Sequence, residues 1–558
     1  MTRRDVAIVA AAAPAPRSVT GSTGAGRGQG RWPTWVLALL VALVVFAAFA
    51  PALSNGFVNW DDDVNITDNP HFRGFSAAHL RWMFTTTLMG HYIPLTWLTL
   101  ALDYTLWGMN PRGYHLTSVL LHALDAALVF LVARRLLRDA PVGAAAAAAL
   151  VFGLHPLRVE SVAWVTERRD VVSGLFGLLA LLAYLRAVDG VGRLQRRWLG
   201  ASLGLFAASL LSKAITMTFP AVLLILDAYP LRRRALREKA PFFALGALGA
   251  GAALVAIHTT PVTSWESYGA GARIAVSLFG LAFYVSRTLV PIGLSPLYEM
   301  PAVLDPLAPE FVLSAAMTLG LTAAAIRFRR RAPWFGAAWA AYVLMVLPVA
   351  GPVHTGLELA HDRYSYLSCL PWALLAGAGV GALWTARRRG TLSAPVFAAS
   401  ASAVIAVLAG WSYLTVQQVR VWRTSETLWR AAVAVDPACS VCRSNLGRAL
   451  LDTGRLDEAE REFRAAVELW PGRANPHNSL GVVFYREGRL ADAAREFAIA
   501  ARLKPGFAMP LNNLGVLQAQ SGRLEEARES FETALRLAPD YAEARENLAR
   551  VRAQLGVR

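Results

Sequence analysis

The sequence has little cysteine, little negative charge and few charged residues overall for a chain of 558 residues. Charged side chains make up 17% of it, and 38 Asp and Glu face 55 Lys and Arg, a formal net charge of +17. Apolar residues account for 55%, above the ~45–50% usual in soluble domains. These proportions exclude an ordinary single soluble fold and, over most of the chain, disorder. A basic and strongly apolar chain is typical of a polytopic membrane protein.

The three cysteines are Cys369, Cys439 and Cys442. The last two form a C-x-x-C pair, but no histidine follows directly for haem attachment and no second pair is present for a zinc site. A local disulfide, two inert thiols and redox catalysis all stay open for this pair.

Most of the excess basic charge lies in the apolar part of the chain. Residues 440–558 hold 18 basic and 16 acidic residues, so 37 of the 55 basic residues precede them. The basic residues form short clusters between apolar runs, for example at Arg134, Arg135 and Arg138. Such clusters mark cytoplasmic loops by the positive-inside bias, and the acidic loops between them face the opposite compartment. Because nucleic-acid binding needs basic residues gathered on a polar face, we expect no nucleic-acid partner.

The apolar runs predict eleven membrane crossings, where about 20 residues are needed to cross straight. Residues 273–291 are also apolar, but a crossing there would move the basic cluster from Arg327 to Arg331 outside, so we predict that this segment is re-entrant or interfacial. The N-terminus is then cytoplasmic and the C-terminus extracytoplasmic, in the inner cell membrane. The predicted crossings lie near residues 35–50, 113–133, 142–155, 171–187, 199–212, 214–229, 241–258, 310–326, 333–351, 367–385 and 393–415.

A different periodicity begins after this membrane part. Leu446-Gly447 recurs 34 residues later as Leu480-Gly481 and again as Leu514-Gly515, and Phe463, Pro471 and the Gly454-Arg455-Leu456 turn recur in step. This is the tetratricopeptide signature. We therefore predict an all-α chain with a disordered tail at 1–31, a membrane domain at 32–418 and a repeat domain at 419–558. The repeat domain comprises a half repeat, repeats at 440–473, 474–507 and 508–541, and a cap helix, and its concave groove would take a peptide or protein.

Three loops on the predicted outer side carry reactive side chains. The first loop holds Asp61, Asp62 and Asp63 at the membrane surface, where apolar surroundings raise a carboxylate's pKa enough for it to act as a base. The second loop runs from His155 to Asp170 and mixes acids, arginines and imidazole. The third, His361 to Leu367, places Arg363 beside tyrosines, a donor set that suits a phosphate. Asp125 lies within a predicted crossing, where a carboxylate needs a partner.

These loops, with the C-terminal repeats, resemble the transmembrane and tetratricopeptide-repeat O-mannosyltransferases, specifically bacterial relatives within the GT-C glycosyltransferase superfamily. The resemblance rests on the first-loop Asp pair, the His-Pro…Glu…Glu-Arg-Arg-Asp loop, the Asp-Arg-Tyr-x-Tyr-Leu segment and the repeats. It implies a GT-C-like membrane fold with an extracytoplasmic cleft. It also implies a polyprenyl-phosphate-linked sugar as donor substrate and transfer, with inversion, to Ser or Thr hydroxyls of protein.

The resemblance also implies roles for individual residues. Asp61 with Asp62 would supply the base, and Asp63 leaves the choice among the three acids open. Glu160 and Asp170 would orient the acceptor or a metal, while Arg168 and Arg363 would face the leaving phosphate. The other residues expected to contact substrate are His155, Lys213, Tyr364 and Tyr366.

Two other functions fit the sequence. A non-enzymatic membrane scaffold would use the repeats to assemble partners, and a ligase would transfer the sugar to a saccharide acceptor. A divalent cation held by Asp61 or Asp62 is compatible with the first loop, but no ligand spacing requires one. The sequence does not identify the sugar, the acceptor or the oligomeric state.

Overall fold

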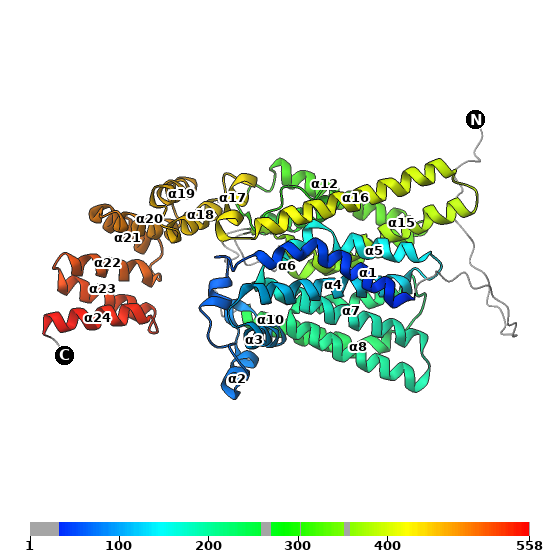
Figure 1. Ribbon diagram of the computed structural model, residues 1–558, viewed down its shortest axis with the longest axis horizontal. Helices are drawn as coiled ribbons and strands as arrows, with labels where there is room; N and C mark the ends of the chain where they lie inside the picture. Colours follow the sequence, from blue (N-terminus) through cyan, green and yellow to red (C-terminus); the bar gives the residue numbers. More distant parts are fainter. Residues whose placement is uncertain (1–32, 258–268, 302, 351–357, 557–558) are drawn as a thin grey trace.

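The chain folds almost entirely into α-helices, as predicted (Figure 1). The structure, a computed structural model, describes residues 33–257, 269–301, 303–350 and 358–556, so the predicted disordered tail at 1–31 lies outside the described residues. Within the described residues, the only sheet is a pair of antiparallel strands, β1 (Tyr298–Glu299) and β2 (Glu358–Ala360). Helices α1 to α16 form one bundle, and α17 to α24 extend from one end of it (Figure 1).

Seven helical segments of the described chain are long and apolar enough to cross a membrane. Two bent helix pairs, Val142–Gly153 with Pro156–Ala163 and Asp362–Ser368 with Leu370–Arg388, pass the same test when each pair is taken together. Two shorter apolar helical segments, Ala214–Ala228 and Pro333–Val349, are also present. The seven segments are Thr34–Ser54, Pro111–Leu136, Val165–Asp189, Leu236–Ile257, Ala270–Leu289, Pro309–Arg327 and Ala394–Val421.

Two segments bear on the predicted membrane crossings. Residues 273–291, expected to be re-entrant or interfacial, lie largely in α11 (Ala270–Leu289), a continuous helix of 20 residues that is long and apolar enough to cross. The run at 199–212 belongs to α8 (Gly192–Ser212), which starts with three arginines and is not among the apolar segments.

Small residues allow the bundle helices to pack closely. Gly377 of α15 (Leu370–Arg388) lies against α5 (Val142–Gly153), where an added Cβ would stand 2.4 Å from the backbone oxygen of Ala144. Gly153 packs in the same way on Val45 of α1 (Thr34–Phe49). Close approach of this kind supplies the van der Waals contact that holds helices together in lipid. The remaining bundle helices are α2 (Ala77–Thr85), α3 (Pro94–Trp107), α4 (Pro111–Leu136), α6 (Val159–Ala163), α7 (Arg168–Asp189), α9 (Phe219–Ala228), α10 (Ala240–Ile257), α12 (Pro309–Arg327), α13 (Pro333–Val346), α14 (Ser365–Ser368) and α16 (Ala394–Val421).

The C-terminal helices form the predicted tetratricopeptide repeats. In each repeat the two helices meet at a glycine with a left-handed backbone, such as Gly454 with φ 77°, a conformation that favours glycine. The repeated phenylalanine packs on the glycine of its own repeat: an added Cβ at Gly447 would stand 2.9 Å from the Phe463 ring. The helices are α17 (Ser425–Val435), α18 (Ser440–Asp452), α19 (Leu456–Leu469), α20 (Ala474–Arg486), α21 (Leu490–Leu503), α22 (Ala508–Gln520), α23 (Leu524–Leu537) and α24 (Ala542–Leu555).

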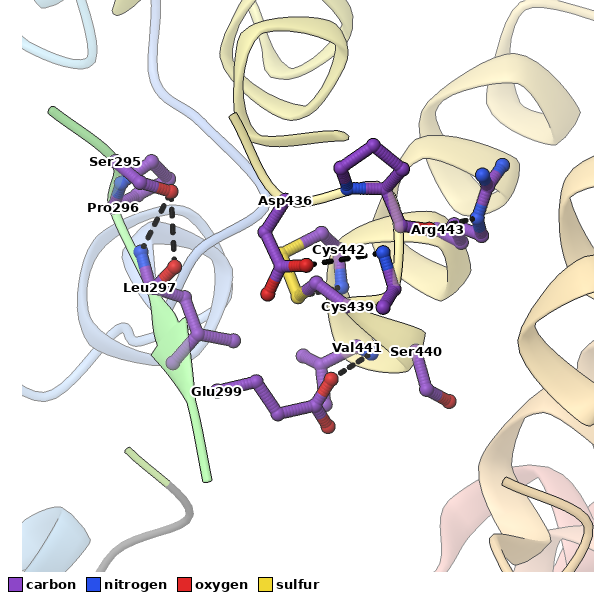
Figure 2. Close-up of a disulfide and its surroundings, with 12 residues drawn as sticks. Ser295, Pro296, Leu297, Glu299, Asp436, Cys439, Ser440, Val441, Cys442 and Arg443 are labelled. Carbon is purple, nitrogen blue, oxygen red and sulfur yellow. Dashed lines mark hydrogen bonds between the residues drawn. A yellow bond between two sulfur atoms is a disulfide. The ribbon is translucent and has the colours of Figure 1, made fainter. Parts of the chain in front are cut away.

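Cys439 and Cys442 form a disulfide where the first full repeat meets the bundle (Figure 2). Both side chains are buried, and Cys439 Sγ accepts a hydrogen bond from the Cys442 backbone N–H. Beside the bridge, Glu299 of β1 accepts a hydrogen bond from the Val441 N–H at 3.4 Å (Figure 2). Glu299 also forms an ion pair with Arg473. Of the three alternatives for this cysteine pair, the structure therefore has the local disulfide, within the joint between bundle and repeats.

Candidate active site

The first loop is held against the second by Asp62. Its Oδ1 accepts hydrogen bonds from the Thr166 N–H at 3.0 Å and the Thr166 hydroxyl at 2.7 Å, and its Oδ2 accepts the Val58 N–H at 3.0 Å. Burial raises the pKa of Asp62 to about 7, against the opposing effect of these donors. Because both oxygens are engaged and the side chain is only 1% exposed, Asp62 positions the loop and cannot easily reach an incoming hydroxyl.

Asp61 has the opposite character. Its carboxylate has no hydrogen-bond partner among the described residues. The residue is largely buried but keeps some exposure to solvent. Burial raises the pKa of Asp61 to about 6, and the positive charges of Arg169 and Arg363 oppose that rise. The residue sits at φ 62°, in the left-handed region, which is uncommon for a side chain other than glycine and often marks functional sites. Of the three first-loop acids, Asp61 therefore has the environment of a proton acceptor.

The second loop contributes Glu167 as the centre of a buried charge cluster. Arg169 donates to both Glu167 oxygens, with Nε at 3.0 Å from Oε2. Lys213 Nζ lies 2.9 Å from Glu167 Oε2 and 2.6 Å from Asp170 Oδ1. The cluster brings together Asp170 and Lys213, two of the predicted site residues, across the 43 positions that separate them.

Arg363 joins the third loop to the same cluster. Its Nη1 lies 2.6 Å from Glu160 Oε1, its backbone N–H donates to Glu160 Oε2 at 2.9 Å, and its Nε lies 3.1 Å from Glu167 Oε1. Glu160 and Arg363, two of the predicted site residues, are thereby brought together, and His361 approaches the same carboxylate at 3.6 Å. The three loops meet at one end of the bundle, the end that carries the repeats (Figure 1).

Two guanidinium groups in this cluster retain donors for a ligand. Arg169 Nη1 and Arg363 Nη2 have no hydrogen-bond partner among the described residues, whereas the other side-chain nitrogens of both are paired with carboxylates. Both arginines act electrostatically on Asp61, so they lie near it. Fixed donors beside a carboxylate that lacks a partner are suited to a reaction in which an anion leaves as a proton is taken up.

Two predicted site residues lie away from the cluster. Arg168 is fully buried and bonds to Asp103 at 2.7 Å, to the Ser118 hydroxyl at 2.8 Å and to the Tyr114 carbonyl at 2.5 Å. It therefore fixes the start of α7 to α3 and α4, whereas its neighbour Arg169 bonds to Glu167 in the cluster.

His155 is likewise a structural residue. Its Nδ1 accepts the Leu157 N–H at 3.2 Å and its Nε2–H donates to the Thr288 carbonyl at 3.0 Å, which joins the second loop to α11. With both ring nitrogens engaged, it contributes no group to the cluster.

The two predicted tyrosines differ in how accessible their hydroxyls are. The Tyr366 hydroxyl is 2.6 Å from Asp125 Oδ2 and 2.9 Å from His122 Nδ1, so it provides the partner that Asp125 requires at membrane depth. The Tyr364 hydroxyl has no partner among the described residues, and its ring lies 5.1 Å from the Arg363 guanidinium carbon. Tyr364 is thus the tyrosine able to contact a ligand through its hydroxyl.

Two cavities flank the cluster. One lies between α7, α9 and the third loop, and Asp170, Arg363 and Tyr364 line it together with leucines. The other, about 280 Å³, lies between α8 and α10, where apolar residues line most of the wall and Lys213 and His91 line the rest. Each cavity has charged residues in one part of its lining and apolar residues in the rest. Such a lining suits an amphiphilic ligand.

The described residues contain no group of three or more His, Cys, Asp and Glu side chains arranged to hold a metal ion.

Asn59 connects the first loop to the repeats. Its Oδ1 accepts the Trp429 Nε1–H at 2.7 Å, and its backbone N–H donates to the Ser425 hydroxyl at 2.9 Å, both on α17. Trp60 packs edge-on against Trp429 and stacks on Trp164 of the second loop. The repeats thus contact the loop only two residues before Asp61.

Sequence reasoning did not assign Glu167, Arg169 or Asn59 to the site. The Glu-Arg-Arg-Asp run signals that arginines and acids gather there, but two adjacent arginines look alike in a sequence. Asn59 precedes the acidic run directly, and only its contacts with α17 reveal its connection to the repeats.

Comparison with known proteins gives matches to the repeats and to a group of related chains. The tetratricopeptide repeat model matches residues 421–474 and 444–508, and a TPR repeat model matches residues 518–556. Human protein O-mannosyl-transferase TMTC1 is 27% identical over 78% of this chain and 55% of its own length. Human protein O-mannosyl-transferase TMTC4 is 26% identical over 77% of this chain and 66% of its own length.

The Drosophila melanogaster protein O-mannosyl-transferase Tmtc1 is 38% identical over 31% of this chain and 21% of its own length. The chain thus spans about half of human TMTC1 and less than two thirds of the length of each of these relatives. The homologues of this chain are TMTC protein O-mannosyl-transferases, and its C-terminal region consists of tetratricopeptide repeats.

Proposed function

We propose that this chain is a membrane glycosyltransferase that transfers a hexose, mannose or a similar sugar, from a polyprenyl-phosphate donor to Ser or Thr hydroxyls of proteins on the extracytoplasmic side. One observation carries the proposal: Asp61, without a hydrogen-bond partner, lies near Arg169 and Arg363, each of which retains an Nη group without a partner. The names of the homologues supply the reaction class.

Asp61 acts as the general base in this proposal. A Ser or Thr hydroxyl is a weak nucleophile, so a carboxylate must accept its proton as the oxygen attacks the anomeric carbon. The pKa of about 6 leaves Asp61 mostly ionised at neutral pH and more basic than an ordinary aspartate. A single displacement from the face opposite the lipid phosphate inverts the configuration at that carbon.

Arg169 and Arg363 stabilise the departing phosphate. As the bond between the anomeric carbon and the phosphate oxygen breaks, negative charge accumulates on the phosphate, and the two Nη groups donate to it. Their carboxylate partners hold both guanidinium groups in place before the reaction, so little reorganisation is needed. One fixed donor of this kind contributes about 3 kcal/mol to transition-state stabilisation.

The cavity between α8 and α10 suits the isoprenoid chain. Its wall is mostly apolar, and the Lys213 side chain, which also contacts the charge cluster, marks the end where the phosphate would lie. Leu248 of α10 lines this cavity and is 71% exposed on the bundle surface. A lipid could therefore enter from the bilayer with its headgroup directed toward Asp61.

The repeats bring the acceptor to the site. A tetratricopeptide array presents a concave groove suited to extended peptides. The contacts of Asn59 and Trp60 with α17 place the start of that array beside the first loop. We propose that acceptor proteins bind the groove and present a hydroxyl to Asp61.

The test is sugar transfer by the purified full chain from a polyprenyl-phosphate mannose to a Ser- and Thr-containing peptide. Asp61→Asn should lower turnover about 10³-fold while leaving the donor bound, because the amide cannot accept a proton. Asp63→Asn is the matched control: Asp63 bonds to the N–H of its own neighbour Val64, so its loss should change turnover less than threefold or about 0.6 kcal/mol.

The outcome also separates the other functions. Equal transfer by wild type and Asp61→Asn would refute the base assignment. A chain that binds no lipid phosphate and transfers nothing supports the scaffold. Product found only in envelope polysaccharide supports the saccharide ligase.

A further inference from the structure

A basic cavity lies at the opposite end of the bundle from Asp61. It measures about 430 Å³ and is lined by Thr34 at the start of α1 and by residues from the ends of α4 and α7. Since α1 has 16 residues at 1.5 Å each, the cavity lies about 24 Å from the first loop. It is therefore separate from the proposed active site. Its lining residues are Thr34, Leu131, Arg134, Arg135, Arg138, Leu182, Arg186 and Asp189.

The lining carries four arginines and a single carboxylate, an excess of three positive charges. Asp189 accepts hydrogen bonds from Arg135 at 2.5 Å and Arg138 at 2.7 Å, and so holds these two guanidinium groups in place. Arg134 has no hydrogen-bond or ion-pair partner among the described residues, although its side chain is half-buried. Arg186 stacks on Trp198 at 5.0 Å, and its guanidinium nitrogens likewise bond to no described residue.

We propose that this cavity binds the phosphate of an anionic phospholipid headgroup. Guanidinium groups without partners provide planar donor pairs that match phosphate oxygens. The N-terminus of α1 at the same cavity adds a favourable dipole. Leu131 and Leu182 give the cavity an apolar part, and Leu39 and Leu43 of α1 expose their side chains beyond it, which favours a lipid over free phosphate.

The test measures binding of phosphatidylglycerol to the full-length chain in neutral detergent by native mass spectrometry. Wild type should retain one phosphatidylglycerol more tightly than phosphatidylcholine, and millimolar inorganic phosphate should not displace it. Arg134→Gln should weaken the affinity about fivefold, and Arg134→Gln with Arg186→Gln about 25-fold, since each basic residue near a headgroup is worth about 1 kcal/mol.

Arg388→Gln is the matched control. Arg388 is exposed near the end of α15, and this part of α15 packs against Ala140, just beyond α4. The variant therefore loses one positive charge at the same end of the bundle as Arg134, but outside the cavity. Its affinity should stay within twofold of wild type. Arg134→Lys retains the charge but lacks the planar donors, so it should bind phosphatidylglycerol more weakly than wild type. This milder variant keeps the proposal testable if the double variant does not fold.

Three results would overturn the proposal. Equal affinity for phosphatidylglycerol and phosphatidylcholine would show that the cavity does not select an anionic headgroup. Equal losses of affinity for phosphatidylglycerol in Arg134→Gln and Arg388→Gln would show that the lipid responds to general surface charge and not to this cavity. Displacement of the lipid by inorganic phosphate at equal concentration identifies a free-phosphate site.

Discussion

Ion pairs in the membrane bundle and in the repeats use the same residue types in different surroundings. In the bundle, Arg363 is 9% exposed and bonds to acids about 200 positions earlier in the chain. In the repeats, Arg464 is 52% exposed and bonds to Glu460 one helical turn away. Removing one partner of a buried ion pair strongly destabilises the folded protein, because the other charge is left buried and unpaired. An exposed ion pair contributes only ~0–1 kcal/mol to the stability of the fold. The difference teaches that the whole fold positions the charge of Arg363, whereas a single helix positions that of Arg464.

The largest expected effect comes from changing the donor geometry of Arg363. Arg363→Lys keeps a positive charge for Glu160 and Glu167, so the fold should survive, but it removes the Nη donor proposed for the leaving phosphate. We expect turnover to fall about 100-fold with little change in the thermal unfolding midpoint. Full activity in Arg363→Lys would show that the guanidinium does not act on the phosphate.

The pH dependence of transfer should report the ionisation of Asp61. Burial raises its pKa to about 6, and only the ionised carboxylate accepts a proton. We therefore expect kcat/KM to be constant near neutral pH and to fall about tenfold per unit as the pH drops below 6. The measurement is the initial rate at low substrate concentration, with protein stability checked at each pH. A profile that stays flat down to pH 4.5 would contradict the assignment.

A smaller effect is expected where the bundle meets the repeats. Trp429→Phe keeps the ring packing against Trp60 but removes the N–H that Asn59 accepts. Loss of one such hydrogen bond should lower kcat/KM for a protein acceptor about fivefold. Trp384→Phe, at an exposed position of α15, serves as the control. Identical kinetics in both variants would show that this contact does not position the first loop.

The smallest effect should come from an exposed pair of the repeats. Arg464→Gln breaks its contact with Glu460, and we expect less than about 0.5 kcal/mol of lost stability and no change in turnover. Thermal unfolding and the transfer assay check both values. If Arg464→Gln lost as much turnover as Arg363→Lys, the difference in burial would not explain the different roles of the two arginines.

The repeats could be predicted from the sequence helix by helix because each repeat contacts mainly its neighbours. The positions of Gly447, Phe463 and Pro471 determine a local packing unit, and the unit recurs. Long apolar runs likewise indicated most of the bundle helices. Local patterns do not reveal which helices meet, so the pairing of Asp125 with Tyr366 was not predicted.

The candidate site was predictable as a set of loops, but not as a set of contacts. Arg168 and Arg169 are adjacent in the sequence, yet successive residues of a helix point in directions about 100° apart, so one bonds to Asp103 and the other to Glu167. The three first-loop acids also differ only through structure. Asp62 is bonded to Thr166, while the left-handed backbone of Asp61 leaves its carboxylate without a partner.

The most direct test is a cryo-electron microscopy structure of the full chain with a bound polyprenyl monophosphate. The phosphate is expected to lie within hydrogen-bond distance of Arg169 and Arg363, on the side of the cluster that faces Asp61. A phosphate bound out of reach of both arginines would contradict it.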